Sequence, residues 1–275
     1  MTQAIGLVGT KLKVDRAKRH LNEYNAILKA FIERDPYQIT YELDPLSGEL
    51  VMAARVREGL PAELSTVIGD VVHNLRSALD QMVCALVRSN GQKVTRAHSF
   101  PIAEAAQKFA KLASVRLEHV PQKARRFIYL LRPYQGGNRL FWLLSELDNM
   151  DKHDDIIPVA EGSAQTQLKI GSPAMFITPD GGLGLGGGPP GSVPFGHHWG
   201  WVIPDDAKRV ELTSGYQELY RVSPKLAGFN IDYQMGVRIT LGAARAAQGE
   251  VASQLLNELI KLVERVVSIV ERRFF

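Results

Sequence analysis

Cysteine is nearly absent from the sequence, since Cys84 is the only one among 275 residues. A single thiol excludes an intrachain disulfide framework and a zinc site built from several thiolates. No apolar run approaches the ~20 residues that a bilayer-spanning helix needs, and the N-terminus lacks the apolar core of a signal peptide. We therefore expect a cytoplasmic protein with no membrane partner, and we predict neither a cofactor nor a bound metal.

An excess of one charge is also lacking, because the net charge is +4. This value is too small to require a nucleic-acid partner, but the basic residues are clustered. Five bases and one acid lie between Lys11 and Arg19. A second stretch has six bases against Glu118: Arg116, Lys123, Arg125, Arg126, Arg132 and Arg139. Such stretches suit phosphate binding through counterion release, and they equally suit a solvated helix face.

The hydrophobic content of 45% is typical of a globular protein. Apolar residues at helical spacing, together with turn signals, predict an α+β protein with a helical core and inserted antiparallel β segments. We expect one domain over residues 1–275. The helical core is predicted over 8–34, 61–153 and 243–275, with a β-hairpin at 36–58 and a β and loop insertion at 156–241.

The segment 61–89 is the strongest predicted helix, and its polar face is unusual. Lys and Glu are missing from the stretch 69–87, where Asp, Asn, Ser and His occupy the face opposite the apolar one. Short polar residues are weak helix formers in water, but they fit where another helix packs closely. We therefore predict that this helix is packed on two faces, and its candidate site residues are His73, Arg76 and Asp80.

A second predicted helix, over 138–153, offers a partner for that polar face. Asn149 and His153 lie on one side of it, away from the apolar leucines. Asp148 and Lys152 have the spacing of an ion pair, which contributes about 0.3–0.5 kcal/mol if exposed. Three interpretations of the combined polar cluster stay open: a structural network, general acid–base or phosphodiester chemistry, and a His/carboxylate metal site.

Three strings carry a resemblance to known proteins: GDVVHNLRSALD (69–80), PYQGG (133–137) and ELDNMDKHD (146–154). They resemble the motifs of a group of uncharacterised bacterial proteins, in which Arg is expected where this chain has Asp154. More distantly, Asn149 and His153 resemble the Asn-x-x-x-His part of the site of the HEPN superfamily, which includes metal-independent ribonucleases. Asp148 stands where that superfamily has Arg.

The HEPN resemblance implies RNA as partner and a ribonuclease mechanism. A ribose 2′-hydroxyl would attack the adjacent phosphate, with His153 as general base or acid and Arg76 offsetting the phosphate charge. Asn149 would position the phosphate or the base, and Asp80 would orient His73. The stretch 116–139 would face the RNA. The alternative function is a non-catalytic binding or scaffolding protein whose polar cluster only specifies packing.

Two further segments carry expectations. The helix at 243–273 is apolar on two sides, so it must be buried either in the core or against a second subunit, and we predict a homodimer through it. The glycine-rich segment 180–200 is expected to be a surface loop, because its glycines do not have the context of a phosphate-binding loop. His197, His198, Trp199 and Trp201 are interpreted as part of an aromatic loop.

Overall fold

The computed structural model describes residues 6–153, 156–168, 175–177, 183–185, 193–194, 209–222, 231–242 and 247–275. The chain divides into two compact units. The helical unit comprises Met1–Glu33, Leu60–Pro158 and Ile239–Phe275, and the β unit comprises Arg34–Gly59 and Val159–Arg238. The α+β class is confirmed, whereas the single-domain organisation stays a prediction.

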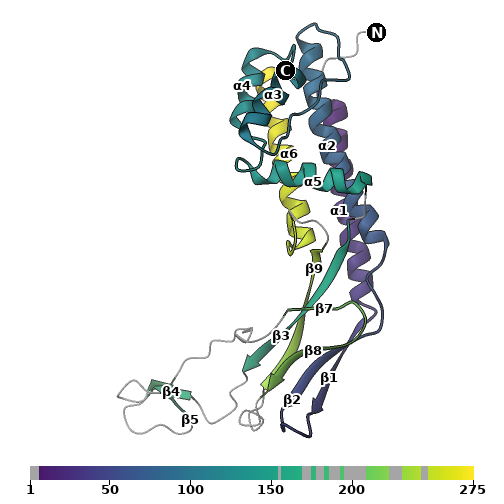
Figure 1. The fold of residues 1–275 in the computed structure, drawn as a ribbon, viewed down its shortest axis with the longest axis vertical. Helices are drawn as coiled ribbons and strands as arrows, with labels where there is room; N and C mark the ends of the chain where they lie inside the picture. Colours follow the sequence, from purple (N-terminus) through teal and green to yellow (C-terminus); the bar gives the residue numbers. More distant parts are fainter. Residues whose placement is uncertain are drawn as a thin grey trace. The chain divides into compact units, whose positions relative to one another are not determined.

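Helices form most of the helical unit (Figure 1). They are α1 (Val8–Ile32), α2 (Glu63–Ser89), α3 (Ala106–Arg116), α4 (Gln122–Leu130), α5 (Arg139–His153) and α6 (Ala252–Phe274). Helix α2 ends where Gly91 adopts a φ of +70°, a left-handed conformation that glycine accepts without steric cost. The predicted helix at 243–273 begins later than expected, at Ala252.

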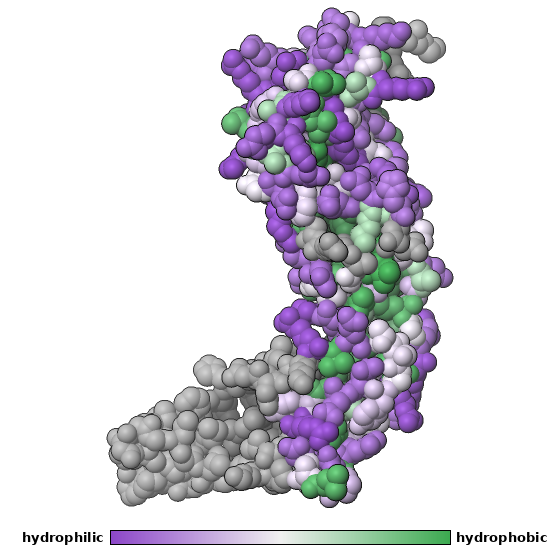
Figure 2. Space-filling model, in the orientation of Figure 1, coloured by the Kyte–Doolittle hydropathy of each residue, from purple (hydrophilic) through white to green (hydrophobic). Residues whose placement is uncertain are grey.

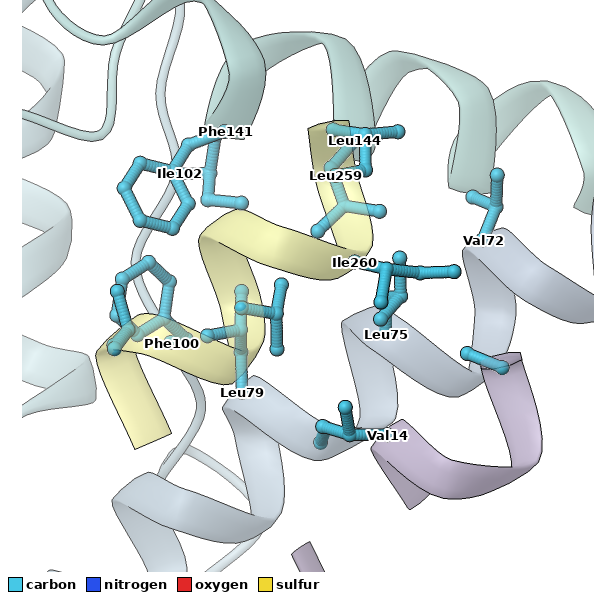
Figure 3. Packing of buried hydrophobic residues seen from close by; sticks show 14 of the residues in the cluster. Val14, Val72, Leu75, Leu79, Phe100, Ile102, Phe141, Leu144, Leu259 and Ile260 are labelled. Carbon is cyan, nitrogen blue, oxygen red and sulfur yellow. The ribbon is translucent and has the colours of Figure 1, made fainter. Parts of the chain in front are cut away.

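The core of the helical unit is built around α2, whose apolar face is fully buried at positions such as Leu75 and Leu79. Helix α2 packs against α1, α5 and α6. Figure 3 shows Leu75 and Leu79 of α2 beside Leu259 and Ile260 of α6. The periodic apolar residues form helices here because each helix then presents one continuous apolar stripe to its neighbours.

Most residues of the two apolar stripes of α6 are buried inside this core, whereas Leu262 and Ile269 are only half-buried. Leu255, Leu259 and Val266 of one stripe are at most 2% exposed. Leu256, Ile260 and Val263 of the other are at most 3% exposed. The chain's own helices α1, α2 and α5 supply these contacts. Packing within one chain therefore explains most of the apolar character of α6. The homodimer stays a prediction, but the apolar stripes of α6 no longer argue for it.

The β unit contains three three-stranded sheets among the described residues. The first has the order β1-β2-β8, and its strands β1 (Tyr37–Leu43) and β2 (Leu50–Val56) form the predicted hairpin. The others have the orders β7-β3-β9 and β5-β4-β6. Their strands are β3 (Pro158–Leu168), β4 (Met175–Ile177), β5 (Leu183–Leu185), β6 (Val193–Pro194), β7 (Val210–Glu211) and β9 (Ile231–Leu241).

Two expectations about the β insertion need correction. Strand β8 (Gly215–Val222) was not predicted, yet it completes the first sheet by pairing with β2. Part of the glycine-rich segment forms the short strands β5 and β6 instead of a loop, because both pair with β4. The rest of that segment, including His197, His198 and Trp199, lies outside the described residues, as does Trp201.

Candidate functional site

The polar face of α2 is packed only in part, because Asn74 is buried whereas Asp70, His73 and Gln81 are exposed. The Asn74 side chain, 7% exposed, donates to the Asp70 carbonyl at 2.7 Å and accepts from the Lys13 amine of α1 at 3.3 Å. Other basic residues of α1 are also engaged, since Lys11 and Lys18 pair with Glu271 and Glu264 of α6. The first basic stretch thus binds helices together.

Arg76 and Asp80 form a network with the loop that follows α2. The Arg76 guanidinium donates to the Phe100 carbonyl at 2.8 Å and lies 3.1 Å from the Asp80 carboxylate. The Phe100 amide donates to the same carboxylate at 2.8 Å. Burial raises the pKa of Asp80, an effect that the charge of Arg76 opposes. These two residues therefore hold the backbone of Phe100 on both sides.

The loop between α2 and α3 is anchored at further points. The Phe100 ring packs on Phe141 of α5, with ring centroids 5.2 Å apart. The buried His98 accepts a hydrogen bond from the Thr95 amide at 2.8 Å through Nδ1, and the Cys84 thiol contacts the His98 carbonyl at 3.7 Å. The loop residues Arg96 and Ser99 are consequently held in place beside α3.

His73 faces Asp148, and not Asp80 as the sequence had suggested. Its Nδ1 lies 3.7 Å from Asp148 Oδ1, an ion-pair distance that is too long for a hydrogen bond. The Asp148 carboxylate is 3% exposed and also pairs with the half-exposed Lys152, so the predicted ion pair is buried on one side only. On its other side, His73 Nε2 lies 3.4 Å from the Ser77 hydroxyl.

Asp151 lies where α5 meets α2 at Gly69. A Cβ atom at Gly69 would lie 1.8 Å from Asp151 Oδ1, so no other residue fits there unless that carboxylate moves. Burial and the charge of Asp148 raise the pKa of Asp151, while His73 lowers it. The crossing of α2 and α5 therefore gathers carboxylates around one half-exposed imidazole.

The predicted site residues are divided among separate places. Arg76 and Asp80 belong to the Phe100 network, and His73 belongs to the Asp148 cluster. Asn149 lines a cavity on the other side of α5. His153 is exposed at the C-terminal end of α5. No hydrogen bond or ion pair joins His73 to His153 within the part of the chain that the structure describes.

A basic cavity of the helical unit lies beside α3. Its volume is about 480 Å³, and its walls are Arg96, Ala97, Ser99, Lys108, Lys111, Leu112, Val115 and Arg116. Four of these side chains are cationic, and no carboxylate is among the described residues that line it. Burial and the neighbouring charge of Arg76 lower the pKa of Arg116, while Asp80 opposes this effect. An anion bound here would offset this crowding of positive charge.

A smaller cavity adjoins the basic one, because Lys108 and Leu112 line both. It has a volume of about 290 Å³ and is also lined by Ile102, Ala103, Glu104, Trp142, Ser145, Glu146 and Asn149. Its Ala103 wall is held by the PYQGG turn, since the Ala103 amide donates to the Pro133 carbonyl at 3.2 Å. The motif thus shapes the cavity through its backbone.

No family model, curated protein or solved structure matches the chain. Within the described ranges, no group of three or more His, Cys, Asp or Glu side chains is placed to hold a metal ion. None of the described helices is both long and apolar enough to cross a membrane. The case for a function therefore depends on the cavities and on the two polar clusters.

The second basic stretch does not form a single binding surface. Arg125 donates to the Leu117 carbonyl at 2.8 Å, and Arg139 pairs with Glu250 at 2.5 Å. Lys123 and Arg126 are exposed on α4, in a region whose visible face is largely hydrophilic (Figure 2). Of the whole stretch, Arg116 alone is among the residues that line the basic cavity.

Sequence reasoning missed Arg96, Lys108 and Lys111, which provide most of the positive charge of the cavity. The last two are three positions apart on α3, a spacing that places them on one helix face. That signal was present in the sequence. The approach of Arg96 to the same face depends on how the Phe100 loop folds back, which no local pattern reveals.

Proposed function

We propose that the protein binds RNA in the basic cavity at α3. The observation that carries the proposal is the cavity of about 480 Å³ in which Arg96, Lys108, Lys111 and Arg116 converge. The sugar–phosphate backbone of RNA is a ligand for such clustered cations, because Arg and Lys bind its phosphates with release of counterions. The Arg76–Asp80 network supports this role, because it holds the loop that carries Arg96.

The test compares two double variants that lose the same charge. Arg96→Gln/Lys111→Gln removes two cavity cations, and Lys123→Gln/Arg126→Gln removes two exposed cations outside it. Binding of a short, labelled single-stranded RNA is measured by fluorescence anisotropy over a range of salt. Each lost phosphate contact reduces the slope of log binding constant against log salt concentration by about 0.7. The cavity variant loses two contacts, so at ~0.1 M salt we expect it to bind RNA roughly 25-fold more weakly than the unaltered protein.

The control variant distinguishes a site from general attraction. If both double variants weaken binding equally, net charge alone is responsible and the cavity is not the site. If the unaltered protein binds no RNA, the proposal is wrong, and the non-catalytic scaffolding interpretation of the polar cluster takes its place.

RNA cleavage is a second candidate, supported by the pairing of His73 with the buried Asp148. A buried carboxylate that faces one imidazole nitrogen orients the ring, and the other nitrogen can then take part in proton transfer. His73 then replaces His153 as the favoured general base or acid. The same RNA, incubated with chelator, should be cleaved by the unaltered protein and not by His73→Gln; equal cleavage by both removes His73 from the mechanism.

A further inference from the structure

The two adjoining cavities differ in their electrostatic character. In the smaller one, Glu104 pairs with Lys108, and Glu146 adds a second carboxylate. The larger one is lined by four cations and, among its described residues, by no acid. A ligand that spans both cavities would therefore place an anionic end in the larger cavity and not in the smaller.

The smaller cavity has the chemistry of a pocket for a flat, polar-edged ring. Ile102 and Leu112 provide apolar walls, and Trp142 adds an aromatic one. The Trp142 indole nitrogen is buried without a hydrogen-bond partner in the described chain. Glu146 and Asn149 offer an acceptor and an amide at the rim. A volume of about 290 Å³ lies at the lower limit of ligand pockets, roughly 300–1,000 Å³, so it suits one ring system.

We propose that the two cavities together bind one nucleobase–phosphate unit. The base occupies the smaller cavity against Trp142, with its edge toward Glu146 and Asn149. Its phosphate lies in the larger cavity at Arg96, Lys111 and Arg116. This inference rests on the proposed RNA binding. It adds a contact with the base in the smaller cavity, which phosphate binding alone would not require. The unit can be a free nucleotide or one nucleotide of a single strand.

Stacking of a base on Trp142 can be measured through the fluorescence of this tryptophan. The chain has three tryptophans, so Trp199→Phe/Trp201→Phe leaves Trp142 as the only reporter. This variant is titrated with single-stranded RNA, with an abasic oligomer of equal length, and with each of the four nucleoside monophosphates. RNA should quench the fluorescence of Trp142 and the abasic oligomer should not, and RNA should bind about 5- to 150-fold more tightly, as expected for one stacked base.

The two sources of the ligand give different results. Saturable quenching by a monophosphate identifies a free nucleotide as sufficient, whereas quenching by the oligomer alone identifies a strand. Either result supports the base site. If the abasic oligomer binds as tightly as RNA, the base site is refuted while RNA binding through phosphates stands. If neither oligomer binds, the proposed function fails as well.

Variants at the rim test the assignment of the smaller cavity without disturbing the core, because Glu146 and Asn149 are exposed. Glu146→Gln and Asn149→Ala should weaken the binding of RNA severalfold and leave the abasic oligomer unaffected. Glu258→Gln, an exposed carboxylate of α6 outside both cavities, is the matched control. Equal weakening of both oligomers by the rim variants would overturn the proposal.

Discussion

Gly69 and Asp151 illustrate how single residues set the contact between α2 and α5. The space above Gly69 is occupied by the Asp151 carboxylate, whose carbon lies 2.6 Å from where a Cβ would be. Asp151 is exposed and sits in the last turn of α5, so its side chain can rotate away at moderate cost. Glycine in a helix interior otherwise costs about 1 kcal/mol relative to alanine.

A double-mutant cycle measures this contact. In an Asp151→Ala background, Gly69→Ala should stabilise the protein by about 1 kcal/mol, because helix propensity improves and nothing collides. In the unaltered background, the gain should be smaller by about 0.5 kcal/mol or more, because the carboxylate must move. Urea unfolding of the four proteins gives the coupling. An equal gain in both backgrounds would mean that the two residues do not meet.

Asp148 shows what residue-level patterns miss. Its spacing from Lys152 predicted an ion pair, and that pair forms. Its burial and its approach to His73 could not be predicted, because both depend on the crossing of α5 over α2. Asp80 accepts from the Phe100 amide of the loop after α2, and it lies about 10.5 Å along the helix axis from His73, seven residues away on the same helix.

At the scale of elements, the turn between β1 and β2 is tied to β8 by charge. Arg221 of β8 lies 2.7 Å from the Asp44 carboxylate and also pairs with Glu49 and Glu218. The Asp44 carboxylate further accepts from the amides of Leu46 and Ser47. These contacts lower the pKa of Asp44 to about 2, and the hydrogen bond from Arg221 contributes most to this shift.

This pKa has a definite consequence for acid stability. A carboxyl whose pKa is lower in the folded state contributes stability above its unfolded pKa of about 3.9. That contribution is lost as the pH falls through about 2. Arg221→Gln should raise the pKa of Asp44 toward its ordinary value but not fully to it, because the two amides still donate. NMR titration of the carboxyl measures the shift.

Arg34→Gln is the control for this titration. Arg34 lowers the pKa of Glu58 and pairs with it at the other end of the hairpin. Its loss should leave the pKa of Asp44 unchanged. A pKa of Asp44 that stays near 2 in Arg221→Gln would show that the turn amides alone hold the carboxylate in its charged form.

At the scale of the whole molecule, α6 completes the core of the helical unit, which buries most of its apolar residues. Leu259 is fully buried in this core, beside Leu144 of α5 in Figure 3. Leu259→Ala should lower the free energy of unfolding by about 2–5 kcal/mol through loss of apolar contact and formation of a cavity. Glu258→Ala, at an exposed neighbouring site, should change it by about 0.5 kcal/mol or less.

The dependence of unfolding on protein concentration tests the homodimer. If α6 packs within one chain, the denaturation midpoint should not move with protein concentration, either before or after the Leu259→Ala change. A midpoint that rises with concentration in the unaltered protein, and more weakly in Leu259→Ala, would instead place Leu259 in a subunit interface.

The sequence by itself determined most of the helices, the first β-hairpin and the buried apolar face of α2. These depend on local periodicity and on turn residues. Strand β8 was missed because its pairing with β2 joins segments far apart in the chain. The late start of α6 was missed because a region rich in alanine does not mark the helix boundary.

Only the tertiary structure decided which polar residues share a site. It separated His73 from Arg76 and Asp80, placed Asn149 beside Trp142, and brought Arg96 to the lysines of α3. A helical pattern states which face a residue occupies, but its partner depends on the crossing of helices and on the path of loops. Those are set by packing across the entire core, and the candidate ligand site exists only once that packing is complete.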